Sequence, residues 1–185
     1  VYGIDITEAF IEIGNYFNKL TQIDHQVKLL KGDGKKLPYQ TEFFNGAVSQ
    51  HVTMNIEDRE QFFNEAFRVL KKGAIFGFSE HGLGTKGSPI FPLPWADNED
   101  MSFLKTPEYT KSVLKKIGFK NIEIISTGEK YLSGYNSLLK KGQSNEKPTL
   151  GIHVIGGDSM IERSKNSMQS IIENRTYPFE IICNR

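Results

Sequence analysis

The segment from Gly32 to Ala74 constrains the fold more than any other part of this 185-residue chain. It contains an acidic, glycine-flanked turn, a short apolar strand pattern, an amphipathic helix pattern and a second short apolar pattern, in that order. Strands that alternate with helices favour a parallel sheet, whose strands end at the same edge. Ligands bind at that edge in open α/β sheets. The pattern therefore predicts a site built from the residues that follow these strands: Asp33, Ser49, Gln50 and His51.

The rest of the chain continues this alternation. Apolar patterns predict strands over 1–6, 26–30, 43–50, 74–79, 121–126 and 177–183, and helices over 7–20, 58–70, 106–117, 131–141 and 159–173. The stretch 82–105 is rich in glycine and proline, and loops of this length are usually functional lids or disordered. We predict one domain over residues 1–185, with a doubly wound, mostly parallel α/β sheet, a lid loop over 82–105 and a helical insert over 131–174.

Four short motifs in the sequence resemble those of a known protein family. They are GIDIT at 3–7, GDGKKLPY at 32–39, SQHVTMNI at 49–56 and EAFRVLKKGA at 65–74. In this order and spacing they resemble class I S-adenosylmethionine-dependent methyltransferases. The resemblance is to the branch of ubiquinone/menaquinone C-methyltransferases and glycine, sarcosine and dimethylglycine N-methyltransferases, and it is least specific over 131–174. It implies S-adenosylmethionine as the cofactor and a Rossmann-like, seven-stranded sheet whose antiparallel last strand lies between the fifth and sixth.

The resemblance also implies that the family's first strand and its glycine-rich turn are absent from this chain. The strand at Val1 then corresponds to the second strand of the family, and the absent strand would lie between it and the strand at Phe43. Two interior strand edges would lack partners. We expect further N-terminal residues (about 30, one strand–helix unit), another chain or a rearrangement to fill this place. For the 185-residue chain alone we expect a homodimer.

The predicted cofactor ligands lie after the first two strands. A carboxylate such as Asp5 at a strand end can accept both ribose hydroxyls of an adenine nucleoside, or it can cap the helix that follows. Ile6 would then lie against the adenine. By the resemblance, Asp33 accepts the adenine amino group and the N–H of Gly34 donates to a ring nitrogen, although Asp33 also suits a turn-stabilising role. The family usually has Ala where this chain has Gly34.

The reacting centre is expected where the third strand ends. Methyl transfer is an in-line displacement, so the protein mainly supplies alignment and a polar, preorganised surrounding. Ser49 and Gln50 offer oxygen atoms to the positively charged sulfonium of the cofactor. His51 is predicted to orient the acceptor or to take its proton, with a packed structural histidine as the alternative. Substrate-pocket positions are also expected just downstream, at Met54 and Asn55, with core packing as the alternative for either residue.

The next strand and the predicted lid supply the remaining candidates. Glu80 and His81 could form an acid–imidazole pair that binds an ammonium or carboxylate group, or they could cap the lid. Trp95 is the sole tryptophan, and aromatic faces attract alkylated ammonium groups; its alternative role is to anchor the loop. No two histidines have metal-ligand spacing, so we predict no catalytic metal.

Composition excludes several function classes. The 23 basic and 22 acidic residues give a net charge of +1, so nothing in the charge favours nucleic acid. The single cysteine, Cys183, excludes an internal disulfide and a cysteine-rich metal site. No apolar run is long enough to cross a membrane, and no signal peptide is present, so we expect a cytoplasmic protein.

Three functions follow as hypotheses. The first is methyl transfer to a small soluble acceptor, an amine nitrogen of the glycine, sarcosine or dimethylglycine kind. The second keeps the cofactor and changes the acceptor to a quinone-like carbon. The third, motivated by the absent glycine turn, is a catalytically inactive fragment or interaction module. A nicotinamide dehydrogenase fits Asp5 but neither the GDGKKLPY motif nor the long loop.

Overall fold

The computed structural model describes residues 1–142, 157 and 159–185. The strands are β1 (Tyr2–Asp5), β2 (Lys28–Lys31), β3 (Phe44–Gln50), β4 (Leu70–Leu83), β5 (Lys120–Ser126) and β6 (Thr176–Asn184). The helices are α1 (Glu8–Leu20), α2 (Arg59–Val69), α3 (Pro107–Ile117), α4 (Gly128–Gly142) and α6 (Met160–Ile172). Two short 3-10 helices, η1 (Thr53–Asn55) and η2 (Glu99–Met101), complete the elements. The predicted helical insert is described at α4 and α6, and its middle lies outside the described residues.

The strands form two sheets. β1 and β2 pair in parallel, and together with α1 they make the N-terminal unit, residues 1–31. The second sheet has the order β3-β4-β6-β5, with β3 and β4 parallel and β6 antiparallel to both of its neighbours. The last strand therefore lies between the two that precede it, which confirms the expected placement of the antiparallel strand. Among the described residues, neither β1 nor β3 has a second strand partner.

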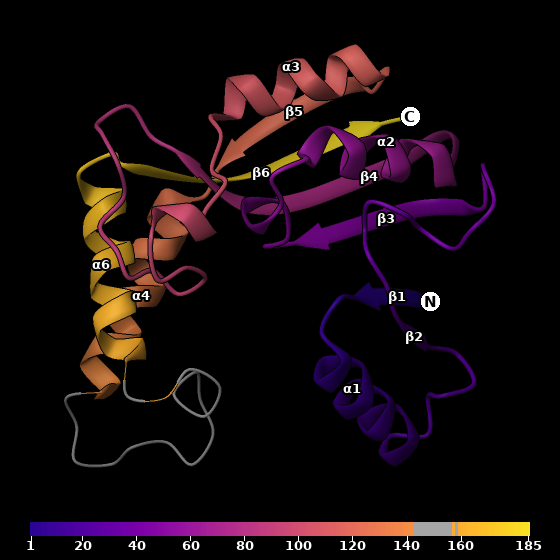
Figure 1. Cartoon of the computed structure of the whole chain (residues 1–185), viewed down its shortest axis with the longest axis horizontal. Helices are drawn as coiled ribbons and strands as arrows, with labels where there is room; N and C mark the ends of the chain where they lie inside the picture. The colour runs from indigo at the N-terminus through magenta and orange to yellow at the C-terminus, as the bar shows by residue number, and fades with distance from the viewer. Residues whose placement is uncertain (143–156, 158) are drawn as a thin grey trace.

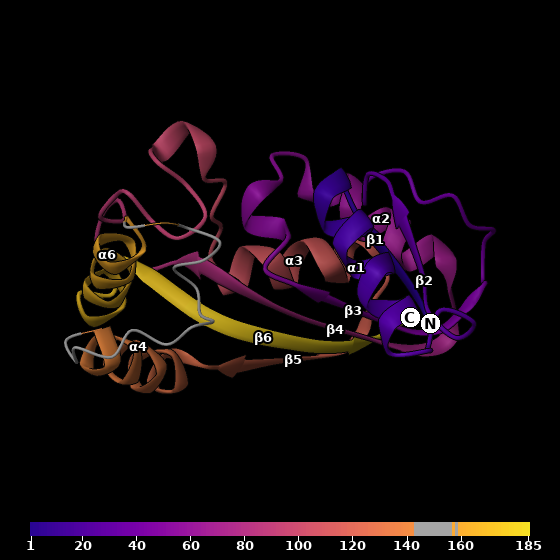
Figure 2. The ribbon, with the colours of Figure 1, turned by 90° about the horizontal axis from the view of Figure 1, so that it is seen from below.

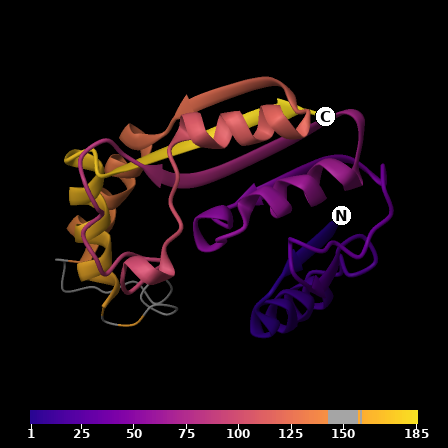
Figure 3. The same ribbon diagram turned by 45° about the horizontal axis from the view of Figure 1, so that its top comes forward.

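The four-stranded sheet has two different faces because successive strand side chains point to opposite sides. Phe76 is paired in register with Cys183, and both are buried with the helices α2 and α3. Figures 2 and 3 show these two helices on the same side of the sheet. On the other face, Val48 is 83% exposed and Ile182 is 43% exposed. The core is therefore one-sided in the described part of the chain.

Local signals explain the bounds of α2 and α3. The Asp58 side chain caps α2 by accepting from the backbone N–H of Gln61 at 3.0 Å, and the apolar stripe of α2 packs into the core. For α3, the Thr106 side chain accepts from the N–H of Tyr109 at 3.2 Å, and Gly118 takes the left-handed conformation, with φ 119°, that ends a helix.

The largest difference from the predicted boundaries lies between α2 and β4. The helix expected to reach residue 70 ends at Val69, and β4 spans 70–83 rather than 74–79. Leu70 already has extended backbone and pairs with Phe44. The register then shifts, because Gly46 pairs with Ile75, and Gly73 has φ 78° within this irregular stretch. Glycine allows that conformation, so Gly73 accommodates an irregularity within the strand.

The helices α4 and α6 lie side by side beyond one end of the four-stranded sheet (Figures 1 and 2). They follow β5 and precede β6, so they sit at the end of the sheet that also carries the last residues of β3 and β4. No helix in the described part of the chain is long and apolar enough to cross a membrane.

Candidate active site

The end of β3 carries a residue in an unusual backbone conformation. His51 follows the last residue of β3 and has φ 54°, a left-handed value that is uncommon for a residue other than glycine. Its backbone N–H donates to the carbonyl of Ser79 on β4 at 2.9 Å, which holds the turn against the neighbouring strand. Such conformations cluster at functional sites, where the surrounding structure holds them in place.

Four side chains from four separate segments meet at this point. His51 Nε2 lies 2.8 Å from the hydroxyl of Tyr131 on α4. The ring of His81, on β4, lies 4.8 Å from the Tyr131 ring and 4.5 Å from the Trp95 ring, measured between centroids. We call His51, His81, Trp95 and Tyr131 the imidazole–aromatic cluster. It brings together three predicted site residues and one that the sequence did not indicate.

Burial keeps this cluster uncharged near neutral pH. Loss of solvent lowers the pKa of His51. The pKa of His81 falls to about 3, chiefly through burial and secondarily through the charge of a protonated His51. The pKa of Tyr131 rises to about 12, first through burial and then through Tyr135 and Glu180. Both imidazoles are therefore neutral, and each can offer one donor and one acceptor nitrogen.

Glu80 lies next to His81 in sequence but contacts a different set of residues. It is 1% exposed, and one carboxylate oxygen lies 3.5 Å from Arg59 Nη1. The hydroxyl of Thr53 donates to the other oxygen, and Arg59 also donates to the carbonyl of Phe103 at 2.6 Å. The expected acid–imidazole pair is therefore not formed, because adjacent strand residues point to opposite faces. A role of Glu80 in substrate binding stays untested.

The Arg59–Glu80 pair fixes the surroundings of the cluster. Arg59 donates to Thr110 on α3 at 3.1 Å, so the pair joins α2, β4, α3 and the end of the long loop. Burial raises the pKa of Glu80 and lowers that of Arg59, because loss of solvent costs both ions more than their attraction returns. Arg59 was not singled out from the sequence, because an arginine in the first turn of a helix does not by itself indicate a buried ion pair.

The predicted cofactor residues lie in the N-terminal unit and in the turn that follows it. Asp5 Oδ1 accepts from the backbone N–H of Thr7 at 2.8 Å, and Asp33 Oδ1 accepts from that of Lys35 at 2.8 Å. Both carboxylates thus stabilise the loops after their strands. Ile6 is 69% exposed. These contacts match the capping and turn-stabilising alternatives for the two acids, and cofactor binding by them stays a prediction.

The structure explains why glycine replaces the usual alanine at position 34. A Cβ atom built on Gly34 would lie 2.7 Å from the ring of Phe62 on α2, too close for a normal contact. The loss of a methyl group at residue 34 therefore accommodates a core phenylalanine, and the backbone N–H is retained.

The other predicted residues differ in their exposure. Met54 is buried in η1, and its carbonyl accepts from the N–H of Phe103 at 2.9 Å. Asn55 is exposed and donates to the carbonyl of His51 at 3.3 Å. Gln50 is exposed at the end of β3, whereas Ser49 is partly buried. These contacts match the packing alternative for Met54 and place Asn55 at the turn of His51, and a substrate-pocket role of either residue stays a prediction.

The predicted lid is packed on helix α6. The N–H of Ile90 donates to Ser170 at 2.9 Å, Asn166 donates to the carbonyl of Pro92 at 3.1 Å, and Arg163 donates to that of Leu93 at 2.7 Å. Leu93 and Ala96 are buried, and Trp95 Nε1 donates to Ser102 at 3.1 Å. Trp95 therefore anchors the loop and also lies against His81, so anchoring and a contact within the site are compatible.

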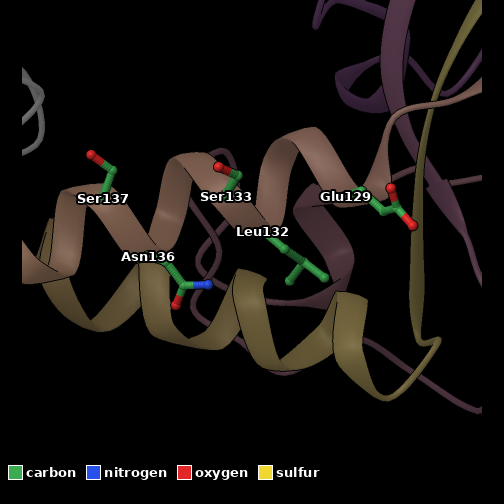
Figure 4. Close-up of a pocket in the computed structure, with 5 residues that line it drawn as sticks. All are labelled: Glu129, Leu132, Ser133, Asn136 and Ser137. Atoms are coloured by element: carbon green, nitrogen blue, oxygen red, sulfur yellow. The ribbon is translucent and has the colours of Figure 1, made fainter.

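A shallow hollow of about 590 Å³ lies on α4, lined by Glu129, Leu132, Ser133, Asn136 and Ser137 (Figure 4). Leu132 points toward α6, whereas Ser133 and Ser137 point away from it. No member of the imidazole–aromatic cluster lines the hollow, so the hollow is separate from that cluster.

Within the part of the chain that the structure describes, no three His, Cys, Asp or Glu side chains are grouped to hold a metal ion.

Comparisons with known proteins agree with this architecture. Residues 1–78 match the methyltransferase domain family. The chain is 24% identical over 168 residues to the sarcosine/dimethylglycine N-methyltransferase of Halorhodospira halochloris, covering 91% of this chain and 59% of the relative. It is 27% identical over 160 residues to the chloroplastic 2-methyl-6-phytyl-1,4-hydroquinone methyltransferase 1 of Oryza sativa, covering 84% of this chain and 44% of the relative.

A solved structure with the same fold is phosphoethanolamine N-methyltransferase 2 of Haemonchus contortus, in complex with phosphomonomethylethanolamine and S-adenosylhomocysteine. Its TM-score is 0.83 at 16% identity, over 100% of this chain and 43% of that chain. This chain thus spans 43% to 59% of the length of each of these proteins. In sequence over residues 1–78, and in fold over the whole chain, the protein is similar to class I S-adenosylmethionine-dependent methyltransferases.

Proposed function

We propose that this chain forms part of an S-adenosylmethionine-dependent methyltransferase that methylates an amine nitrogen of a small soluble acceptor. The observation that carries the proposal is the imidazole–aromatic cluster, where His51 and His81 meet Tyr131 and Trp95 at the carboxyl ends of β3 and β4. Ligands bind at that edge of an open α/β sheet. The likeness to a sarcosine/dimethylglycine N-methyltransferase over 91% of the chain supports the acceptor class.

The cofactor would lie along the same edge. Asp5 accepts the ribose hydroxyls, Ile6 lies against the adenine, Asp33 accepts the adenine amino group and the N–H of Gly34 donates to a ring nitrogen. The bound cofactor supplies the electrophilic methyl group. Ser49 and Gln50 offer oxygen atoms to the sulfonium and keep it aligned.

The cluster supplies the acceptor side. Its members carry no net charge near neutral pH, because burial lowers the pKa of both histidines and raises that of Tyr131. Aromatic faces at Trp95 and Tyr131 attract the positive charge that develops on a nitrogen as it is methylated. The proposed role of His51 is to orient the acceptor, and substrate-pocket roles at Asn55 and Met54 belong to the same proposal.

A quinone-type carbon acceptor is the second candidate. The 27% identity to the rice hydroquinone methyltransferase favours it. A long isoprenoid acceptor needs a broad apolar groove, but Leu93 of the long loop is fully buried against the protein. The amine acceptor is therefore the leading proposal.

We also propose that the 185-residue chain associates as a homodimer. Val48 and Ile75 are exposed on the uncovered sheet face, and β1 and β3 each have one free edge among the described residues. Unpaired edges and apolar surface favour association. Light scattering that reports a monomer with a cooperative unfolding transition would contradict this part of the proposal.

Calorimetry with S-adenosylhomocysteine on the full-length protein tests the cofactor site. Asp5→Ala and Asp33→Ala should each weaken binding by about 1–3 kcal/mol, the scale of leaving polar groups unpaired. Asp24→Ala is the matched control, since Asp24 is an exposed acid in the same unit. Equal affinities in all three variants would overturn the assignment.

A product assay with glycine, sarcosine, dimethylglycine and a short-chain quinone precursor tests the acceptor. Turnover of the quinone precursor alone would refute the proposal of an amine acceptor.

A further inference from the structure

The imidazole–aromatic cluster contains two buried nitrogen atoms without partners. His51 Nδ1 and His81 Nδ1 are both inaccessible to solvent and make no hydrogen bond in the described structure. Nearly all buried polar atoms in proteins have a partner, so an unpaired atom at a candidate site needs an explanation. A bound ligand with a suitable donor is one such partner.

The contact at Tyr131 decides which nitrogen of His51 carries the proton. His51 Nε2 lies 2.8 Å from the Tyr131 hydroxyl, so one of these groups donates to the other. If Nε2–H donates to the phenol oxygen, the unpaired atom Nδ1 is an acceptor. If the phenol donates, Nδ1 carries a buried N–H without a partner. Orphaned N–H groups are rarer than under-satisfied acceptors, which favours the first arrangement.

We propose that Tyr131 is a positioning residue that holds His51 in the Nε2-protonated tautomer, so that Nδ1 accepts the N–H of a primary or secondary amine acceptor. This inference rests on the proposed methyltransferase function and names the acceptor class. Tyr131 comes from α4, 80 residues beyond His51 in sequence, so helix and strand end must come together to form the site.

The proton balance of the reaction is complete with this arrangement. The nitrogen lone pair of a neutral amine attacks the methyl carbon, the carbon–sulfur bond breaks and its electron pair goes to sulfur. The nitrogen becomes positively charged, and its proton passes to His51 Nδ1. The products are the methylated amine, S-adenosylhomocysteine and an imidazolium at His51, which loses its proton once the products leave and the site opens to solvent. A neutral tertiary amine has no N–H, so it cannot make this contact.

His51 suits this role better than His81. The His81 ring is 3% exposed and lies between Trp95 and Tyr131, and its pKa of about 3 makes it a poor proton acceptor. His51 is only partly buried, and it follows the last residue of β3 in a left-handed backbone conformation. The other titratable groups that act on this cluster are Tyr135 on α4 and Glu180 on β6, both through Tyr131.

The chain offers a matched control for Tyr131. Tyr135 lies one turn further along α4, and its hydroxyl lies 2.8 Å from that of Ser167 on α6. Tyr131→Phe and Tyr135→Phe each delete one partly buried hydroxyl from the same helix, but only the first removes the contact with His51.

Nitrogen-15 NMR of histidine-labelled full-length protein tests the tautomer directly, without any need for turnover. We expect His51 to be protonated at Nε2 in the wild-type protein and in Tyr135→Phe, and to show mixed tautomers in Tyr131→Phe. An Nδ1-protonated His51, or the same tautomer in all three proteins, would overturn the proposal.

Kinetics with sarcosine, a secondary amine, and dimethylglycine, a tertiary amine, supply the second readout. Tyr131→Phe and His51→Asn should lower kcat for sarcosine by about 100-fold or more, with little change in KM, and should shift its pH profile. Tyr135→Phe should change neither. Equal losses in the two tyrosine variants, or equal losses for both amines, would contradict the positioning role. Absence of S-adenosylhomocysteine binding in calorimetry would instead refute the proposed function, while the NMR result would still decide the tautomer.

Discussion

The N-terminal unit and the four-stranded sheet differ sharply in how they use their apolar residues. Every buried hydrophobic residue among the described ones lies at Met54 or later. In the N-terminal unit, the apolar residues of α1 that keep helical spacing are largely exposed, and Phe17 is 55% exposed. The rings of Tyr2 and Phe44 lie 5.7 Å apart where the unit meets β3 (Figure 1).

This difference shows that an apolar pattern identifies the inward side of an element but not what covers it. The proposed cofactor side and acceptor side of the site are divided in the same way, between the N-terminal unit and the four-stranded sheet. Asp5 and Ile6 belong to the N-terminal unit, whereas His51, His81 and Tyr131 are held by the well-packed sheet and its helices. We therefore expect the acceptor side to be rigid in this chain and the cofactor side to depend on what packs against the N-terminal unit.

The largest effect should come from truncating the core of the sheet. Phe63 is fully buried against Phe78, so Phe63→Ala should lower the free energy of unfolding by about 3–5 kcal/mol. Phe17→Ala, in the N-terminal unit, should change it by less than about 0.5 kcal/mol, as is usual at exposed positions. Urea denaturation of the two variants measures this contrast, and similar losses would mean that the N-terminal unit is packed in solution.

The next effect concerns the buried ion pair. Arg59→Leu leaves the carboxylate of Glu80 buried without its cation, which should cost about 3 kcal/mol or more. The double variant Arg59→Leu with Glu80→Gln removes the uncompensated charge and should recover part of this loss. Thermal unfolding of both variants measures the loss of stability in the single variant and the recovery in the double variant. A double variant that is less stable than Arg59→Leu would show that the pair stabilises the fold through its hydrogen bonds.

Acid should destabilise the sheet region through His81. The folded-state pKa of His81 is lowered to about 3, while the unfolded chain titrates near 6.5, so only the unfolded chain gains a proton as the pH falls below about 6.5. Stability should therefore fall on acidification, by up to about 1.4 kcal/mol per pH unit for this one group. His51 contributes with the same sign, because burial lowers its pKa too.

Urea denaturation between pH 7 and pH 5 measures the acid effect before most carboxylates titrate. His81→Gln should flatten the dependence. His25→Gln is the matched control, because His25 is an exposed histidine in the N-terminal unit. A slope that responds to His25 and not to His81 would reverse the assignment of the two histidines.

The smallest effect should arise where the two regions join. Gly34 lies in the segment between the N-terminal unit and β3, and an added Cβ would meet the Phe62 ring. Gly34→Ala should lower the free energy of unfolding by about 1 kcal/mol through this overpacking. Combining it with Phe62→Leu should relieve the contact. Additive losses in a double-mutant cycle would show that residue 34 and the core are independent.

The family resemblance predicted the position of the antiparallel last strand. Sequence patterns placed His51 and His81 at one edge, because strand ends are local signals. They also placed Glu80 beside His81, although alternation along β4 sends its side chain to Arg59 instead. Tyr131 was predicted only as the start of a helix, since nothing near it in sequence indicates a contact 80 residues away. The exposure of the apolar residues of α1 also depends on packing, and the helical spacing of apolar residues does not show which element, if any, covers them. The single-domain organisation and the homodimer stay predictions.

The position of β6 affects how this chain can fold during synthesis. β6 pairs with both β4 and β5, and Ile75 on β4 meets Asn184 about a hundred residues later. A ribosome delivers β3, β4 and β5 first, and β4 and β5 cannot be joined until the strand between them emerges. Until then, Phe76 and Phe78 lack Ile181 and Cys183, which complete their apolar surroundings. The growing chain therefore exposes apolar side chains on an incomplete sheet. We expect the nascent chain to depend on chaperones until residues 176–184 have left the ribosomal exit tunnel.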